Sequence, residues 1–147
     1  MMEINTDEYF MGMALQQAMM ALEDDEVPIG AIVVANNRVI GKGYNQTEML
    51  NDVTAHAEMI AITAASNALG SKYLTECTIY VTIEPCNMCA GAIKWARPAR
   101  VVYGASEPKF GYSITDENII GKKTEVTRGV GAEAAAALMA DFFKKKR

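Results

Sequence analysis

Several residue types are scarce in this sequence, and their scarcity excludes some classes of protein. Among 147 residues there are three cysteines, one histidine and one tryptophan, while half of the residues are apolar. No run approaches the roughly eighteen consecutive apolar residues that a membrane-spanning helix needs, so we expect no membrane segment. The odd cysteine count and the lack of an apolar leader favour a reducing, cytoplasmic location over secretion with disulfide bonds. With no internal repeat or low-complexity segment, the length predicts one globular domain over residues 1–147.

Charge of one sign is not in large excess either. The net charge is −4, which argues mildly against a nucleic-acid partner because such partners usually select a basic face. The charges are unevenly placed, since acidic residues crowd positions 23–26 and basic residues occupy positions 144–147. A local basic patch can therefore coexist with an acidic protein.

The single histidine and two of the cysteines form a pattern that is typical of a catalytic zinc site. His56 lies in Thr-Ala-His-Ala-Glu, and Cys86 and Cys89 lie in Pro-Cys-Asn-Met-Cys about thirty positions later. Nitrogen and thiolate sulfur are donors that zinc prefers, and without a second histidine we expect the fourth position to be open to water. Glu58 is then placed to move the protons of that water. His-x-Glu followed by Pro-Cys-x-x-Cys is the signature of zinc-dependent nucleobase deaminases.

Other interpretations of these residues remain open. A Cys-x-x-Cys pair by itself can be a redox pair, and a lone histidine more often lies in a core or on a surface. Cys77 could be a fourth ligand and make the zinc structural, although a free cysteine commonly behaves as a small buried apolar residue. The coincidence of Glu58 and Pro85 with the histidine and cysteine motifs favours the catalytic site.

Hydrophobic periodicity predicts alternating helices and strands. Asn36 and Asn37 form a good two-residue turn between the first two strands, because asparagine tolerates positive φ. Helices are expected over residues 7–22, 55–68, 86–96 and 132–145. Strands are expected over residues 29–35, 38–44, 78–83 and 100–104, with a weaker one over 123–128.

This element order predicts a layered α/β domain in which an antiparallel hairpin leads into a largely parallel sheet. His56 and Cys86 each open a helix, so the metal is expected between two helix N-termini. The positive ends of the helix dipoles favour thiolates there. We expect His56 and Glu58 in the same first turn, with the glutamate reaching over the metal.

The expected chemistry is a hydrolytic deamination. Zinc lowers the pKa of its water toward 7 and so produces a nucleophile for an electron-poor ring carbon that bears an amino group. Glu58 takes the proton of the water and delivers protons to the neighbouring ring nitrogen and the departing amine. The products are a ring carbonyl and ammonia.

Motifs along almost the whole chain add a family resemblance. They occupy residues 26–31, 43–45, 54–58, 80–92 and 141–143. In them the sequence resembles the bacterial tRNA-specific adenosine deaminases, which make inosine at the wobble position, within the cytidine deaminase-like superfamily. The zinc motifs identify only the superfamily, whereas residues 26–31, Asn45 and the Phe-Phe pair at 142–143 point to the tRNA branch. The resemblance implies a three-layer α/β/α fold with a central mixed five-stranded sheet.

The resemblance also implies roles for further residues and partners. Asn45 is expected to hydrogen-bond the target base, and Val27 and the Ala57 backbone to form its pocket. It implies one zinc ion per subunit, no organic cofactor, and a homodimer whose two subunits contact the tRNA anticodon loop. Residues expected to contact RNA are Lys109, Phe142, Phe143, Lys146 and Arg147. For the two phenylalanines, core packing of one ring is the alternative, since both cannot face inward on a helix.

Departures from the family pattern keep a second function open. Where the family usually has an Arg-Asp pair after residue 105, this loop reads Ser-Glu-Pro-Lys-Phe-Gly, and only Lys109 and Gly111 match well. The run Trp-Ala-Arg-Pro from Trp95 to Pro98 looks more like the guanine deaminase branch. A deaminase of a free nucleobase or nucleoside, such as guanine, cytosine or cytidine, is therefore the alternative. A non-enzymatic RNA-binding subunit with a structural zinc would be expected to lack Glu58.

Overall fold

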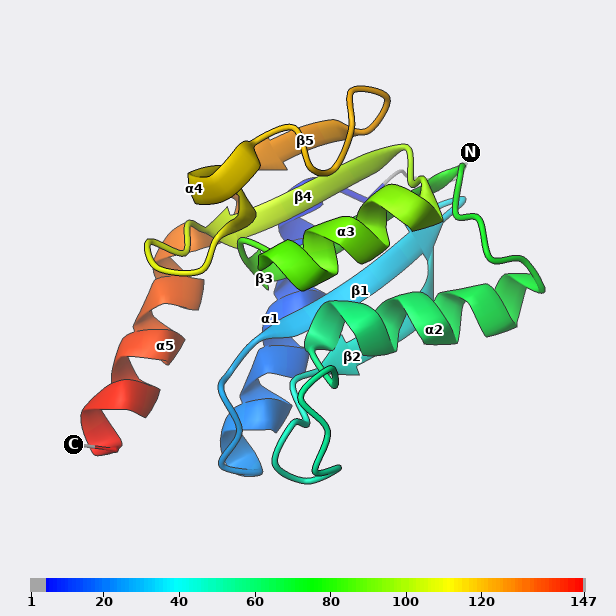
Figure 1. Ribbon diagram of the computed structural model, residues 1–147. Helices are drawn as coiled ribbons and strands as arrows, with labels where there is room; N and C mark the ends of the chain where they lie inside the picture. The colour runs from blue at the N-terminus through cyan, green and yellow to red at the C-terminus, as the bar shows by residue number, and fades with distance from the viewer. Residues whose placement is uncertain (1–4, 147) are drawn as a thin grey trace.

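A central sheet organises the structure, a computed structural model that describes residues 5–146 (Figure 1). The strands are β1 (Gly30–Ala35), β2 (Arg38–Tyr44), β3 (Cys77–Ile83), β4 (Arg100–Ala105) and β5 (Glu125–Arg128). The helices are α1 (Asp7–Glu23), α2 (Ala57–Leu69), α3 (Asn87–Ala96), α4 (Tyr112–Asp116) and α5 (Ala132–Lys145). The strand order is β2-β1-β3-β4-β5.

The sheet is mixed, as the sequence predicts. β1 runs antiparallel to β2 and β3, whereas β3, β4 and β5 run parallel to one another. The turn between β1 and β2 has positive φ at Asn36 (50°) and Asn37 (63°), which matches the right-handed twist of a hairpin. The predicted hairpin and the parallel remainder are both confirmed.

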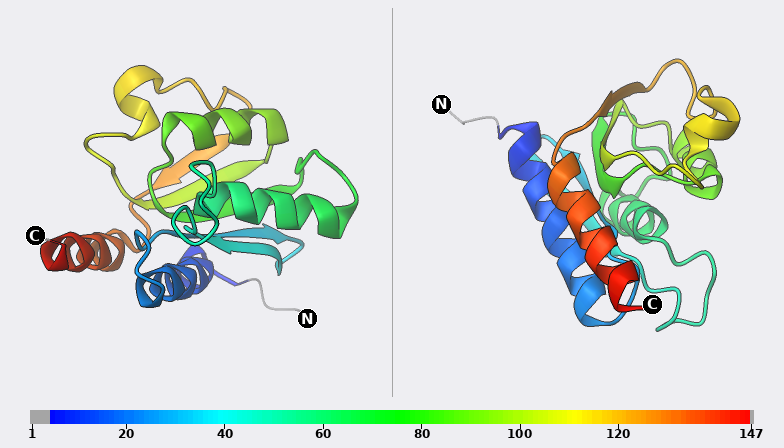
Figure 2. Two further views of the ribbon diagram at one scale, coloured as in Figure 1. Left: turned by 60° about the horizontal axis from the view of Figure 1, so that its bottom comes forward. Right: turned by 90° about the vertical axis from the view of Figure 1, so that its left-hand side faces the viewer.

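Helices cover both faces of the sheet, which confirms the expected three layers. α1 and α5 lie side by side on one face, and α2 and α3 pack against the other (Figure 2). Successive strand residues alternate between the two cores, because side chains of a strand point to opposite faces. Ile32 and Tyr80 pack with α1, whereas Val33 and Ile79 pack with α2 and α3.

Two glycines of β2 let α2 approach the sheet closely. A Cβ atom at Gly41 would lie 2.5 Å from the Ala61 carbonyl oxygen, and one at Gly43 would lie 2.5 Å from that of Ala57. The absence of side chains there brings α2 against the backbone of β2. The contact fixes where the N-terminus of α2 lies, which is where the predicted metal ligand His56 is found.

The main differences from the predicted elements lie at helix starts and in one loop. α2 begins at Ala57 and α3 at Asn87, one or two residues later than predicted, because His56 and Cys86 have extended backbones and serve as N-caps. The short helix α4 was not predicted, since five residues give no usable periodicity. Within residues 5–146, no helix is long and apolar enough to cross a membrane.

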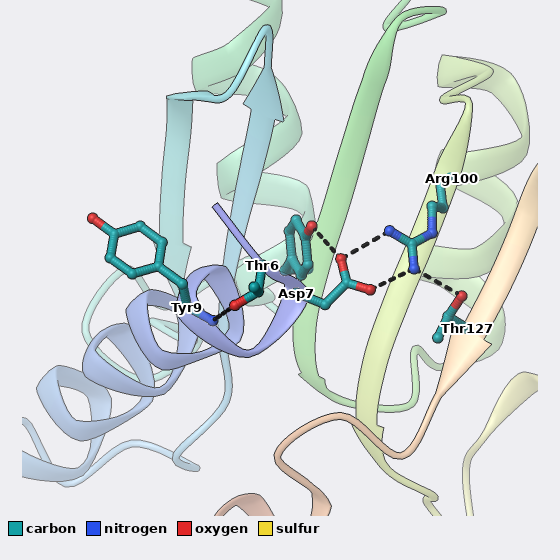
Figure 3. Close-up of polar contacts among 6 residues, drawn as sticks. Thr6, Asp7, Tyr9, Arg100 and Thr127 are labelled. Atoms are coloured by element: carbon teal, nitrogen blue, oxygen red, sulfur yellow. Dashed lines mark hydrogen bonds and ion pairs between the residues drawn. The ribbon is translucent and has the colours of Figure 1, made fainter. Parts of the chain in front are cut away.

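A polar cluster joins the start of α1 to the parallel strands (Figure 3). Nη1 and Nη2 of Arg100 donate to the two carboxylate oxygens of Asp7 at 2.8 and 2.6 Å. The Tyr80 hydroxyl donates to the same carboxylate at 2.7 Å, and Arg100 also donates to Oγ1 of Thr127 at 3.1 Å. The hydrogen bonds from Arg100 hold the pKa of Asp7 below its ordinary value of 3.8.

Replacing Asp7 by asparagine tests this cluster. The folded protein lowers the pKa of Asp7, so the cluster stabilises the fold above the unfolded pKa and loses its contribution as pH falls through the folded value. Asp7→Asn should lower the free energy of unfolding by about 1–2 kcal/mol near pH 7. The difference in the free energy of unfolding between Asp7→Asn and the wild type, measured by urea titration, should shrink below about pH 3.8. Asp141→Asn, at an exposed position of α5, is the control; an equal loss in both variants would contradict a specific role for the cluster.

Candidate active site

Two helix N-termini meet at the predicted metal ligands. His56 caps α2 with φ −80° and ψ 154°, and Cys86 caps α3 with φ −74° and ψ 174°. Their carbonyl oxygens accept the first helical hydrogen bonds, from Ile60 and Ala90, at 3.1 and 2.8 Å. Neither side chain is used for capping, so both are free to converge on one point between the helices.

The three ligand atoms have the spacing of a zinc site. Nδ1 of His56 lies 3.7 Å from Sγ of Cys86 and 3.5 Å from Sγ of Cys89. Bond lengths of about 2.3 Å to sulfur and 2.05 Å to nitrogen at tetrahedral angles require a nitrogen-to-sulfur separation of about 3.6 Å. The observed distances fit one zinc ion held by these residues, with a fourth position left for water.

Cys77 is not part of this group. Within residues 5–146 the ligand cluster comprises His56, Cys86 and Cys89. Cys77 begins β3 and is buried, about 20 Å from the end of that strand, where the cysteine motif follows. The alternative of a closed, four-ligand zinc is therefore wrong for this fold.

The ligands have a charge distribution suited to a cation. A hydrogen bond with the Cys89 thiol lowers the pKa of Cys86 to about 4, so Cys86 is held as a thiolate. Hydrogen bonding with Cys86 raises the pKa of His56, and it also raises the pKa of Cys89. Thiolate is the form of cysteine that binds metals. Metal binding is therefore expected to displace a proton from Cys89.

Glu58 lies in the first turn of α2 beside these ligands. Its side chain is 4% exposed, and burial raises its pKa to about 7. Desolvation disfavours the charged carboxylate, which accounts for the direction of the shift. As expected from the sequence, Glu58 and His56 lie in one turn although residues two apart do not share a helical face.

A cavity of about 1030 Å³ connects this site to the surface. Its walls come from the loops after β2 and β4 and from one side of α5. The predicted site residues that line it are Val27, Asn45, His56, Ala57, Glu58, Cys86, Lys109, Phe143 and Lys146. A more open cavity of about 720 Å³ surrounds Asp7 and Arg100, and it contains none of the metal ligands.

The two phenylalanines of α5 are separated by burial. Phe142 is 7% exposed, whereas Phe143 is 46% exposed and lines the cavity. The rings contact each other edge to face with centroids 5.2 Å apart. The prediction that Phe142 contacts RNA is corrected here, because its ring packs into the protein. Arg147 lies outside the described residues.

Several cavity residues were not predicted. On α5, Ala136, Met139 and Ala140 line the cavity together with Phe143. Their spacing of three or four residues is that of one helix face, a signal present in the sequence. Glu84 and Phe110 also line the cavity. Glu84 lies within the family block 80–92, but the sequence assigned no role to either residue.

Zinc binding can be tested by cysteine substitution. Cys86→Ser should weaken zinc affinity at least tenfold, because hydroxyl replaces thiolate in a three-residue site. Cys77→Ala, which changes the remaining cysteine, should leave affinity unchanged. Competition with a chromophoric chelator measures both. Equal zinc affinity in the two variants would contradict the assignment.

Comparisons with known proteins agree with this geometry. The family model of the cytidine and deoxycytidylate deaminase zinc-binding region matches residues 4–105. The tRNA-specific adenosine deaminase of Agrobacterium fabrum is 44% identical over 144 residues, which are 95% of this chain and 95% of that protein.

Solved structures show the same similarity. One, from work on A-to-I editing by tRNA:A34 deaminases at the wobble position of transfer RNA, is 43% identical with a TM-score of 0.81 and covers 88% of this chain and 98% of its own. The guanine deaminase of Bacillus subtilis is 38% identical with a TM-score of 0.68 and covers 74% of this chain and 73% of its own. From these matches, this chain belongs to the cytidine and deoxycytidylate deaminase zinc-binding family and, within it, to the tRNA-specific adenosine deaminases.

Proposed function

We propose that the protein converts adenosine to inosine at the wobble position of tRNA by zinc-dependent hydrolysis. One observation carries this proposal. A single cavity joins the ligands His56 and Cys86, together with Glu58, to an exposed phenylalanine and lysines at its rim. The membership of the family of tRNA-specific adenosine deaminases supports the same substrate.

Glu58 is the proposed catalytic residue. When bound by His56, Cys86 and Cys89, zinc supplies a water acidic enough to act as a nucleophile near neutral pH. The carboxylate of Glu58 accepts a proton from the attacking water and passes it to the ring nitrogen beside the reacting carbon. A second proton transfer through Glu58 lets the amine leave as ammonia, so adenosine and water give inosine and ammonia.

Asn45 and the adjacent backbone are proposed to hold the base. Asn45 is 6% exposed, and its backbone N–H donates to the Ile29 carbonyl oxygen at 3.1 Å, which fixes the residue at the cavity wall. Its amide can both donate to and accept from the edge of a purine. Val27 and Ala57 supply walls beside it, and apolar walls with a few polar groups are typical of small-ligand sites.

The rim suits single-stranded RNA. Bases stack on exposed aromatic rings, and Phe143 presents one at the cavity mouth. Lys146 pairs with Asp25 at 2.7 Å, but both side chains are exposed, so this pair is weak and the lysine can exchange it for a phosphate. Lys109 lines the cavity from the loop after β4, and Arg147 is proposed from the resemblance alone. An unpaired loop adenosine is also the least costly to extract.

The protein is proposed to act as a cytoplasmic homodimer of single-domain subunits, each with one zinc ion. Met88 and Trp95 are exposed on α3, at 37% and 71%. Between them Gly91 faces open space, so α3 presents a relatively flat apolar surface. Exposed apolar surface of this kind suits a protein partner, and a second copy of the chain is the partner that we propose.

The free-base alternative gains no support from the segment that suggested it. Trp95 and Arg97 lie at the end of α3 and do not line the cavity. The Arg97 guanidinium lies 4.7 Å from the centre of the Tyr73 ring, so it serves a surface contact. This segment therefore gives no evidence that the cavity binds a free purine base.

Removal of the proposed catalytic carboxylate tests the mechanism. Glu58→Ala should lower the turnover of an anticodon stem-loop to inosine by about 10²-fold or more, because proton transfer is lost. Zinc content and fold should be retained, since Glu58 is not a ligand. Glu117→Ala, at an exposed position, controls for loss of a carboxylate. A zinc-loaded Glu58→Ala enzyme with near-normal turnover would rule out the assigned role.

The phenylalanine pair offers a matched test of the RNA surface. Phe143→Ala should raise KM for the stem-loop by roughly tenfold through lost stacking and leave the stability nearly unchanged. Phe142→Ala should leave KM nearly unchanged. It should lower the free energy of unfolding by about 2–4 kcal/mol, because its ring is buried. Steady-state kinetics and urea unfolding on both variants check this. Equal effects on KM would contradict the assignment of Phe143 to RNA.

A further inference from the structure

A loop on the rim of the cavity is attached to the metal-binding turn by one buried carboxylate. The loop, residues 106–111, joins β4 to α4 and carries Lys109 and the 70% exposed Phe110 into the cavity lining. Glu84, directly before the Pro-Cys motif, lies beneath it. We propose that Glu84 is a positioning residue that holds this loop in the shape that meets the nucleotides beside the target adenosine. The inference rests on the proposed function.

Three donors meet the Glu84 carboxylate. Oε1 accepts a hydrogen bond from the backbone N–H of Glu107 at 3.1 Å, at the start of the loop. Oε2 accepts from the backbone N–H of Ser113 at 3.0 Å and from the Ser113 hydroxyl at 2.6 Å, just after the loop. The side chain is 5% exposed, so water competes little for these bonds. The carboxylate therefore fixes both ends of the loop.

Gly111 makes room for this arrangement. A Cβ atom at Gly111 would lie 2.5 Å from the carboxyl carbon of Glu84, a distance that side chains cannot tolerate. The backbone adds further connections, because Tyr112 N–H donates to the Pro85 carbonyl oxygen at 2.9 Å and Gly111 forms a β-bridge with Cys86. The loop and the metal-binding turn thus form one unit.

A second loop at the cavity has a similar arrangement. Glu26 is 1% exposed and lies directly before the pocket residue Val27. Its two carboxylate oxygens accept from the backbone N–H groups of Glu48 and Met49 at 3.1 and 2.7 Å. These residues belong to the loop after β2, which contributes Thr47 to the cavity. Each of these two loops is therefore held by one buried glutamate next to a central strand, Glu84 just after β3 and Glu26 shortly before β1.

Stabilisation of the fold does not by itself explain why glutamates are buried at these two positions. Buried charges lose hydration, and apolar side chains of similar size stabilise a fold at least as well. A carboxylate differs because it selects particular backbone donors and so defines one path of the loop. A loop that is ordered before binding loses less conformational freedom when RNA arrives. The expected benefit of Glu84 is therefore tighter binding of RNA, with little effect on the chemical step.

The test is Glu84→Gln in the zinc-loaded protein, with Glu117→Gln as matched control. The amide NH₂ of glutamine cannot accept a hydrogen bond. In the variant, the donors at one end of the loop therefore lose their acceptor. KM for the anticodon stem-loop should rise about tenfold, while kcat and zinc content stay within about twofold. Amide exchange at Glu107 and Ser113 should accelerate. Glu117→Gln removes the same charge at an exposed position at the end of α4, outside the cavity, and keeps the Glu84 contacts, so its KM should stay unchanged.

Other results would overturn the inference. An unchanged KM in Glu84→Gln would show that the Glu84 contacts do not affect RNA binding, and a lower KM would show that only the negative charge matters. A loss of zinc or of kcat without a rise in KM would show a metal-supporting role. Should Glu84→Gln fail to fold, Ser113→Ala removes only the 2.6 Å bond and must raise KM in the same direction. If the unmodified protein makes no inosine, the proposed function fails, whereas the exchange rates still decide whether Glu84 orders the loop.

Discussion

The structure depends on one geometric constraint: two helices must begin within bonding distance of a single metal ion. The sheet satisfies it by placing α2 against β2, where Gly41 and Gly43 allow close contact, and by starting α3 directly after β3. The two N-caps, with Cys89 in the first turn of α3, then bring imidazole and thiol groups to separations of 3.5–3.7 Å. Because the helices pack on a sheet whose central strands are largely buried, the sheet fixes where the ligand residues lie.

The residues that line the cavity differ in polarity and exposure between its base and its rim. At the base, a buried glutamate and thiolate lie among apolar walls, where electrostatic interactions are strong. At the rim, Phe143, Lys109 and Lys146 provide an aromatic face and positive charge near solvent. A protein of net charge −4 can therefore present a local surface for RNA, because its charges are unevenly distributed along the chain.

The fold and the metal ligands were predictable because they are encoded locally. The apolar, β-branched runs of β1 and β3, the Asn36-Asn37 turn and the cysteine motif each need only a few neighbouring residues to be interpreted. Contacts between distant segments were not predictable in this way. Which phenylalanine of α5 faces inward depends on the packing of that helix beside α1, and the roles of Glu26 and Glu84 depend on loops more than twenty residues away. A buried glutamate looks like any surface glutamate in a sequence.

The most direct test of the central claim is a substrate comparison with the unmodified, zinc-loaded protein. Inosine formation is measured on an anticodon stem-loop with adenosine at the wobble position, and ammonia release is measured in parallel from free guanine, adenine and cytosine. We expect inosine at the wobble position alone, with a KM that rises steeply with salt because phosphate contacts are screened. Ammonia from a free base, with an unmodified stem-loop, would contradict the claim that the aromatic and basic rim serves RNA.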